Sequence, residues 1–164
     1  MNPSLPTTIL PSLRAGDLLL YHRSGFVSWL IRTKTWSKIS HVETYLGDGK
    51  SHAARQGVGV GTFPVNFDGM VKVRRPLQRF DLAAATPYIK QVEGQNYDWI
   101  GLLRFFTIGG PNMKKQFCSE DATRLARAGK IQPFAGDKDA DTVAPSDLDS
   151  TPAYKTLFNL KTGY

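Results

Sequence analysis

The sequence predicts a single α+β domain, because strand-type segments precede helix-type segments along the chain. Short segments with alternating or buried apolar residues fill the first half, and apolar residues at helical spacing dominate the second half. The length of 164 residues, with 41% hydrophobic and 21% charged residues, fits one globular domain with its own core. We expect residues 1–13 to be an irregular lead-in and residues 14–164 to form the domain.

The first half is expected to form an antiparallel sheet. Gly16 and Asp17 form a turn that opens a short buried strand, and the triplet Gly47-Asp48-Gly49 is typical of a hairpin. A helix is expected over residues 24–33, where aromatic and aliphatic residues recur at helical spacing. The expected strands cover residues 18–21, 39–46, 50–60 and 71–74.

The second half is expected to be helical. Residues 81–92 have a helical pattern that Thr86-Pro87 should interrupt, and residues 96–106 form an aromatic-rich second helix. A third helix begins at Cys118 and should end with Gly129 at its C′ position. Residues 135–151 are polar and rich in Asp, with a proline at Pro145, and we expect an exposed loop there.

Charge and cysteine content restrict the function. The chain has 21 Lys and Arg against 14 Asp and Glu, a net charge of +7, which favours an anionic partner. The basic residues are dispersed without a nucleic-acid-binding motif, so we expect no sequence-specific nucleic-acid binding. The only cysteine, Cys118, excludes an internal disulfide and any site made of several cysteines, such as zinc or iron–sulfur centres.

The N-terminal sequence predicts no signal peptide. Its first eleven residues include three prolines and lack both a basic segment and an apolar core. No later apolar run approaches the ~20 residues that a membrane-spanning helix needs. We therefore expect synthesis in the cytoplasm, where a free thiol persists, and no transmembrane segment.

Cys118 is the first candidate for chemistry. A thiol at a helix N-terminus is exposed to the positive end of the helix dipole, which favours the thiolate. The unpaired backbone N–H groups there also suit a developing oxyanion. The alternative is a buried structural cysteine, since free cysteine is among the most buried residue types.

Three histidines are candidates for the base that such a thiol needs: His22, His41 and His52. Strand alternation places His41, Glu43 and Tyr45 on one face, and a sheet packed on the Cys118 helix would hold His41 toward the thiol. The alternative for His41 is a strand histidine bonded to a nearby carbonyl. His22 lies next to Arg23 in a predicted loop, where a surface role is the simpler interpretation.

Four segments in this order resemble one family of enzymes: Gly16-Asp17-Leu18-Leu19, residues 40–49 (Ser-His-Val-Glu-Thr-Tyr-Leu-Gly-Asp-Gly), Tyr97-Asp98-Trp99 and Phe117-Cys118-Ser119-Glu120. They are similar to the circularly permuted branch of the NlpC-type papain-like cysteine peptidases. This branch includes the YiiX-like bacterial proteins and, more distantly, the lecithin retinol acyltransferase-like enzymes. The resemblance covers about residues 14–130. It implies a papain-like fold with a small antiparallel sheet packed against the helix that carries the cysteine.

The resemblance also implies residue roles. Cys118 would be the nucleophile and His41 the base, with a third polar residue that orients the imidazole. In the family that residue is usually a Glu or His about a dozen positions after the catalytic His, where this chain has Ala53; His52 is one position short.

The identity of the third residue therefore remains undecided: Glu43 and His52 are favoured equally, and Gln56 is a less favoured candidate. A two-residue Asp48-Gly49 turn would place Gln56 opposite His41 and His52 opposite Tyr45. Glu43 shares the face of His41, although it could instead pair with Arg55 across the hairpin.

The resemblance implies a thiol-dependent hydrolase without cofactor or metal that cleaves an amide in cell-wall (peptidoglycan) peptides. One alternative is a lipid acyltransferase, phospholipase or thioesterase of the retinol acyltransferase-like type, which would use the same two residues. The other is a non-catalytic phage or surface module on the same scaffold. Without a signal peptide, a peptidoglycan hydrolase would be phage-encoded or would leave the cell by a non-classical route. The oligomeric state is not predicted.

Overall fold

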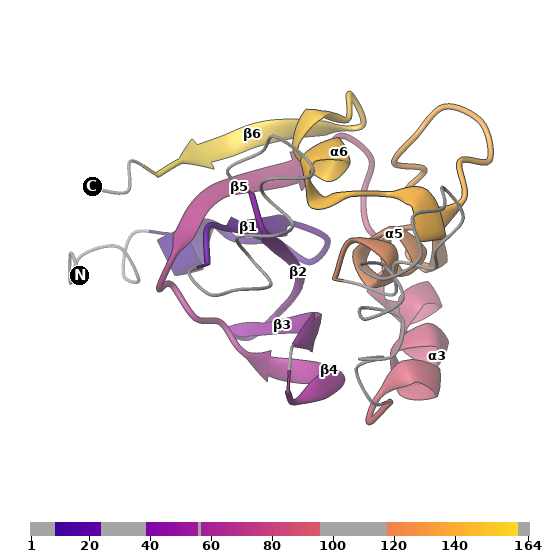
Figure 1. Cartoon of the computed structure of the whole chain (residues 1–164), viewed down its shortest axis with the longest axis horizontal. Coiled ribbons are helices and arrows are strands. Elements are labelled where there is room, and N and C mark those ends of the chain that lie inside the picture. Colours follow the sequence, from indigo (N-terminus) through magenta and orange to yellow (C-terminus); the bar gives the residue numbers. More distant parts are fainter. Residues whose placement is uncertain (1–8, 24–38, 56, 96–117, 161–164) are drawn as a thin grey trace, which may run out of the picture.

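A computed structural model describes residues 9–23, 39–55, 57–95 and 118–160. It contains a six-stranded antiparallel sheet in the order β4-β3-β2-β1-β5-β6, with helices α3 and α5 on one side (Figure 1). This confirms the α+β class. The strands are β1 (Leu18–Tyr21), β2 (His41–Gly47), β3 (Lys50–Arg55), β4 (Gly59–Pro64), β5 (Met70–Pro76) and β6 (Tyr154–Asn159). The helices are α3 (Leu82–Val92), α5 (Cys118–Ala128) and α6 (Pro145–Ser150), with short 3-10 helices η1 (Leu10–Ser12) and η2 (Ala140–Thr142).

Apolar side chains pack on both faces of the sheet. Strand β1 lies inside the sheet and its four residues have no exposed surface. Leu18 and Leu20 pack in the cluster that contains the buried faces of α3 and α5. Leu19 and Tyr21 point the other way, into a cluster that includes Ile9 and Leu13. Residues 9–13 of the expected lead-in therefore cover one face of the sheet.

The expected strand over residues 50–60 is wrong as a single element. The chain turns after Arg55, and β3 and β4 pair with each other as an antiparallel hairpin. Gly57 and Gly59 have φ angles of +76° and +102°, which residues with a side chain rarely adopt. The turn is therefore built at these glycines, in the middle of a segment that otherwise reads as one strand.

Helix α3 continues through Pro87, so the expected interruption is also wrong. The Asp81 side chain caps the helix by accepting a hydrogen bond from the Ala84 N–H at 3.0 Å. Pro87 removes one backbone hydrogen bond. Ala85 and Ile89, on either side of it, are buried in the core, and their packing keeps the two halves of the helix in line.

The expected exposed loop over residues 135–151 instead contains η2 and α6 and leads into β6. Two of its acidic side chains cap these short helices: Asp139 accepts from the Asp141 N–H, and Asp147 accepts from the Ala144 N–H. The buried guanidinium of Arg74 donates to main-chain carbonyls in this segment, namely those of Leu148, Asp149, Thr151 and Tyr154. The polar sequence therefore provides helix caps and acceptors, and the segment adds an edge strand to the sheet.

Helix α5 ends one residue later than the glycine suggests. Lys130, at a φ of +64°, occupies the left-handed C′ position expected for Gly129. The N–H of Ile131 donates to the Ala126 carbonyl and that of Lys130 to the Arg127 carbonyl, which is the Schellman pattern. Gly129 has a different role, since a Cβ there would lie 2.0 Å from the ring of Phe80.

Candidate functional site

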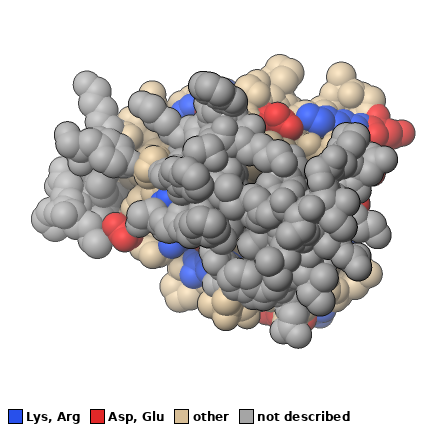
Figure 2. Space-filling model, viewed as in Figure 1, with Lys and Arg blue, Asp and Glu red and all other residues tan. Residues whose placement is uncertain are grey.

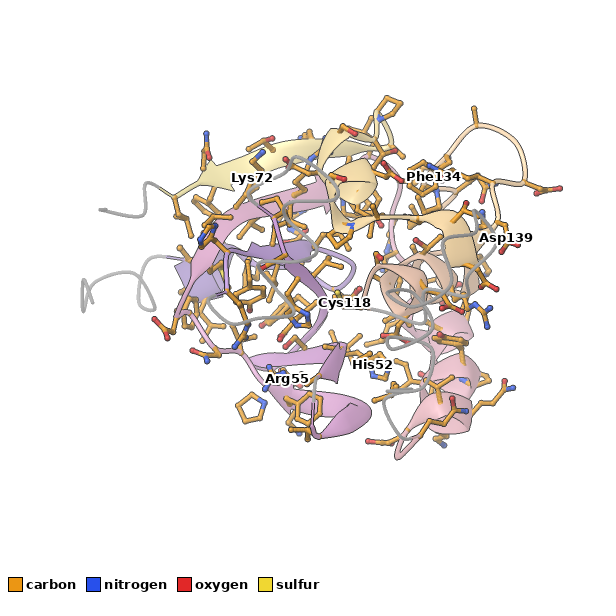
Figure 3. The ribbon with its side chains drawn as sticks, in the orientation of Figure 1. His52, Arg55, Lys72, Cys118, Phe134 and Asp139 are labelled. Carbon is orange, nitrogen blue, oxygen red and sulfur yellow. The ribbon has the colours of Figure 1, made fainter. Side chains whose placement is uncertain are left out.

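The structure brings Cys118, His41 and Glu43 together. His41 is the first residue of β2, and Cys118 is the first residue of α5, which packs against β2. The imidazole responds to the thiol, because the charge and hydrogen bonding of Cys118 are among the causes that raise the pKa of His41. Both residues are shielded from solvent, because Cys118 is 5% exposed and the His41 side chain 12%. Figure 3 shows Cys118 between the sheet and the helices.

Glu43 holds the other side of the His41 ring. Its Oε1 lies 3.1 Å from Nε2 of His41, which leaves Nδ1 as the ring nitrogen available to the thiol. The carboxylate has no exposed surface. It therefore relies on neighbouring side chains for the hydrogen bonds that water would otherwise supply.

Three more side chains complete the shell of Glu43. Arg55 donates through Nε to Oε1 at 3.0 Å and through Nη2 to Oε2 at 2.9 Å. The hydroxyl of Ser51 donates to Oε2 at 2.6 Å. Arg23 approaches Oε1 to 3.6 Å. The two contacts that the sequence offered as alternatives for Glu43 therefore occur together: Glu43 contacts His41 and also pairs with Arg55.

These contacts set the protonation states of the pair. Burial alone would lower the pKa of His41, but the charge and hydrogen bonding of Cys118, together with Glu43, raise it to about 9. Burial alone would raise the pKa of Glu43, but hydrogen bonds from His41, Arg55 and Ser51 lower it to about 2. At neutral pH the imidazole is therefore protonated and the carboxylate is ionised.

Tyr21 and Arg23 lie next to His41. The rings of Tyr21 and His41 lie 5.7 Å apart between centroids, and the guanidinium of Arg23 stacks 4.9 Å above the Tyr21 ring. The N–H of Arg23 donates to the Ser40 hydroxyl at 2.8 Å. Burial raises the pKa of Tyr21 well above its usual value, so the phenol stays neutral. Sequence reasoning missed both residues, since no motif marks the residues at the end of strand β1 as neighbours of His41.

His52 does not meet His41. The hairpin contains an irregularity between Tyr45 and Gly47, so that His52 lies opposite Thr44 and not opposite Tyr45 as expected. A shift of one residue moves a side chain to the other face of a sheet. Figure 3 shows His52 pointing from β3 toward the helices, with Arg55 on the other side of the strand.

His52 joins a separate polar cluster between the sheet and the helices. Its Nε2 lies 3.5 Å from Oδ1 of Asp121 in α5, and the Tyr88 hydroxyl of α3 donates to the same oxygen at 2.9 Å. Glu120, the neighbour of Asp121, pairs with Arg124 at 2.7 Å. The two acidic residues that follow Cys118 thus have partners of their own.

Gln56 lies outside the described residues, as do the helix expected over 24–33, the helix expected over 96–106 and the Tyr97-Asp98-Trp99 motif. Within the described ranges, no group of three or more His, Cys, Asp or Glu side chains is placed to hold a metal ion. In that same part of the chain, no helix is long and apolar enough to cross a membrane. Figure 2 shows basic and acidic atoms side by side at the upper right of this face.

No protein-family model matches the chain, and no curated protein is significantly similar to it. The geometry of the site combines a thiol at the start of a helix, a largely buried protonated imidazole beside it, and an ionised carboxylate behind the imidazole.

Proposed function

We propose that the protein is a cysteine hydrolase of the permuted NlpC-type papain-like kind, with Cys118 as nucleophile and His41 as general acid and base. The observation that carries the proposal is the largely buried His41 ring, which Glu43 contacts at 3.1 Å and whose pKa Cys118 and Glu43 raise. A carboxylate behind the imidazole stabilises the imidazolium that accompanies a thiolate. Glu43 is then the orienting residue, in place of His52 or Gln56.

The reaction follows from these roles. The Cys118 thiolate attacks the substrate carbonyl carbon, and main-chain N–H groups at the start of α5 stabilise the oxyanion. The carbon–nitrogen bond breaks as His41 gives its proton to the leaving amine. Water then attacks the thioester while His41 takes a proton from it, which releases the carboxylic acid and restores the thiolate–imidazolium pair.

The proposed substrate is an amide bond in a cell-wall peptide. This choice rests on the resemblance of four sequence segments, and the net charge of +7 suits the carboxylate-rich peptides of peptidoglycan. An ester or thioester carbonyl would react by the same steps, with an alcohol or thiol as leaving group. Product analysis separates these substrate classes.

The first experiment measures the reactivity of the thiol. Because the chain has one cysteine, one carbamidomethyl group on the protein reports Cys118 alone. An ordinary thiol is only ~0.3% ionised at pH 6. We expect native protein to react with iodoacetamide at pH 6 roughly 100-fold faster than the His41→Ala variant. His52→Asn is the matched control and should react within about twofold of the wild type, since His52 contacts Asp121 instead. The proposal is contradicted if Cys118 in the native protein is alkylated as slowly as Cys118 in protein unfolded with urea.

The second experiment identifies the substrate. Peptidoglycan digests and lipid extracts are incubated with wild type or Cys118→Ala protein, and the products are analysed by mass spectrometry. New amine and carboxylate ends in muropeptides, absent with Cys118→Ala, support the amidase; released fatty acid indicates the lipid alternative. Equal products from both proteins contradict a role for Cys118.

A further inference from the structure

A groove of about 1040 Å³ lies at the end of α5 that is remote from Cys118. Helix α5 has 11 residues, so its two ends are ~16 Å apart. The groove lies between the first turn of α3, the chain before β1 and the connection from β5 to α3. It takes no part in the proposed catalytic chemistry.

The connection from β5 to α3, residues 77–81, is held rigidly. Phe80 is 7% exposed and packs against Gly16 and Gly129 so closely that a Cβ at either glycine would lie within 2.5 Å of it. The Leu77 N–H donates to the Ala153 carbonyl at 2.9 Å. The Asp81 N–H donates to the Gly129 carbonyl, also at 2.9 Å. The side chains between these anchors are therefore presented in a fixed arrangement.

Two exposed leucines line this groove. Leu77 is 64% exposed and Leu82 is 37% exposed, although the main chain around both is firmly anchored. Among the described residues only one other large hydrophobic side chain, Val58, is comparably exposed, and it lies in the turn between β3 and β4. Two exposed leucines on one rigid surface are more informative than single exposed apolar residues.

Basic side chains surround the leucines. Five line the groove: Arg14, Arg75, Arg79, Lys130 and Lys155. Arg75 is neutralised by Asp17 at 2.7 Å, and Lys130 by Asp81 at 2.6 Å. The other three have no ion pair within the described part of the chain. The groove thus combines three uncompensated positive charges with exposed apolar surface.

We propose that this surface docks on a bilayer containing anionic phospholipids. Leu77 and Leu82 enter the interface between headgroups and acyl chains, and Arg14, Arg79 and Lys155 pair with headgroup phosphates. A nucleic acid or another soluble polyanion would gain nothing from the leucines. Among the described residues that line the groove, the one aromatic side chain is Phe80, which is buried and so offers no ring on which bases could stack. The docking goes beyond the proposed hydrolase activity and does not depend on it.

The test is sedimentation with vesicles, using the Cys118→Ala protein so that catalysis plays no role. We expect at least about tenfold tighter binding to vesicles of 70% phosphatidylcholine and 30% phosphatidylglycerol than to pure phosphatidylcholine, weakening as salt rises from 50 to 300 mM. Arg79→Gln and Lys155→Gln should each weaken binding roughly fivefold.

Leucine variants separate a lipid surface from a soluble polyanion. Leu77→Ser should weaken vesicle binding roughly tenfold without changing the net charge. Val58→Ser removes an equally exposed apolar side chain away from the groove and should change nothing. No binding to the anionic vesicles at 50 mM salt overturns the proposal. Equal binding by Leu77→Ser, with release of the protein by single-stranded DNA, overturns it in favour of a polyanion site.

Discussion

Two buried glutamates, Glu43 beside the candidate active site and Glu120 two residues after Cys118, differ in how their charge is accommodated. Both are nearly inaccessible, at 0% and 4% exposed. At Glu43 the effect of burial is outweighed by hydrogen bonds from neighbouring side chains, and the pKa falls to about 2. At Glu120 burial, the neighbouring Asp141 carboxyl and Asp121 raise the pKa to about 8. Burial therefore does not decide the charge of a carboxyl group here; its partners do.

The contacts explain the difference. Both oxygens of Glu43 accept hydrogen bonds, from His41 and Arg55 on one and from Ser51 and Arg55 on the other. Oε1 of Glu120 lies 2.7 Å from Nη2 of the half-exposed Arg124, and its Oε2 has no hydrogen-bond partner among the residues that the structure describes. At neutral pH the carboxyl group next to His41 is thus the one that the protein keeps ionised, and the one on the cysteine helix is mostly protonated. A negative charge at Glu120 would add repulsion at the helix start where the Cys118 thiolate is proposed.

The largest effect is expected from Glu43→Gln. The amide keeps the volume but leaves Arg55 and the His41 imidazolium without their counter-charge, which should cost about 3 kcal/mol in unfolding free energy at pH 7. Because the folded-state pKa of Glu43 is about 2 and the unfolded value is 4.5, its contribution is present above pH 4.5 and is lost as the pH falls through 2. Urea unfolding at several pH values measures the difference between the two proteins.

The same variant, Glu43→Gln, tests how much the carboxylate contributes to the raised pKa of His41. Without the carboxylate, the pKa of His41 should fall from about 9, since one of the groups that stabilise the imidazolium is gone. An NMR titration of His41 gives this value directly. His52→Asn is a suitable control, because it removes a histidine signal without touching Glu43. An unchanged His41 pKa would mean that the 3.1 Å contact between the two side chains has no electrostatic consequence.

Glu120→Gln is expected to act in the opposite direction and more weakly. The pKa of Glu120 is raised from 4.5 to about 8, so ionisation disfavours the folded state progressively as the pH rises from 4.5 through 8. The variant loses the ion pair with Arg124 but escapes this penalty. We expect it to be more stable than the wild type at pH 9, on the order of 2 kcal/mol, and no more stable at pH 4.

Thermal unfolding at pH 4 and pH 9 measures the effect of Glu120→Gln. Asp81→Asn offers a comparison on an exposed carboxylate, whose pKa is lowered and not raised by Lys130 and by the start of α3. If Glu120→Gln lowers stability equally at both pH values, the side chain acts only as an ion-pair partner and the contrast with Glu43 fails.

The sequence predicts the main elements of the fold but not where they turn. Apolar alternation and the Gly47-Asp48-Gly49 triplet identify β1, β2 and the start of β3, since each depends on local residues. The sequence does not predict the break between β3 and β4 or the capped helices before β6. Nothing local distinguishes a polar segment that caps helices from one that forms an exposed loop, because the decisive contacts of Arg74 reach residues more than 70 positions away.

The candidate site follows the same division. Cys118 at a helix start and Glu43 two residues after His41 are visible locally, and the structure brings all three side chains together. The choice between Glu43 and His52 depends on hairpin register, and the irregularity between Tyr45 and Gly47 reverses the face of His52. With that register known, the alternation of β3 would have indicated Ser51 and Arg55 as further neighbours of Glu43.

Ser51→Ala is the smallest and most selective change in the Glu43 shell. The hydroxyl donates to Oε2 at 2.6 Å, but the same oxygen also accepts from Arg55 at 2.9 Å, so the carboxylate remains partnered. We expect a loss of about 1 kcal/mol in unfolding free energy and iodoacetamide reactivity of Cys118 within about twofold of the wild type. If Ser51→Ala slows the alkylation of Cys118 as much as Glu43→Gln does, the orientation of the Glu43 carboxylate matters more for the reactivity of the thiol than its charge. Stability and thiol reactivity, measured on both variants, therefore show whether Glu43 acts as a counter-ion or as a rigid support for His41.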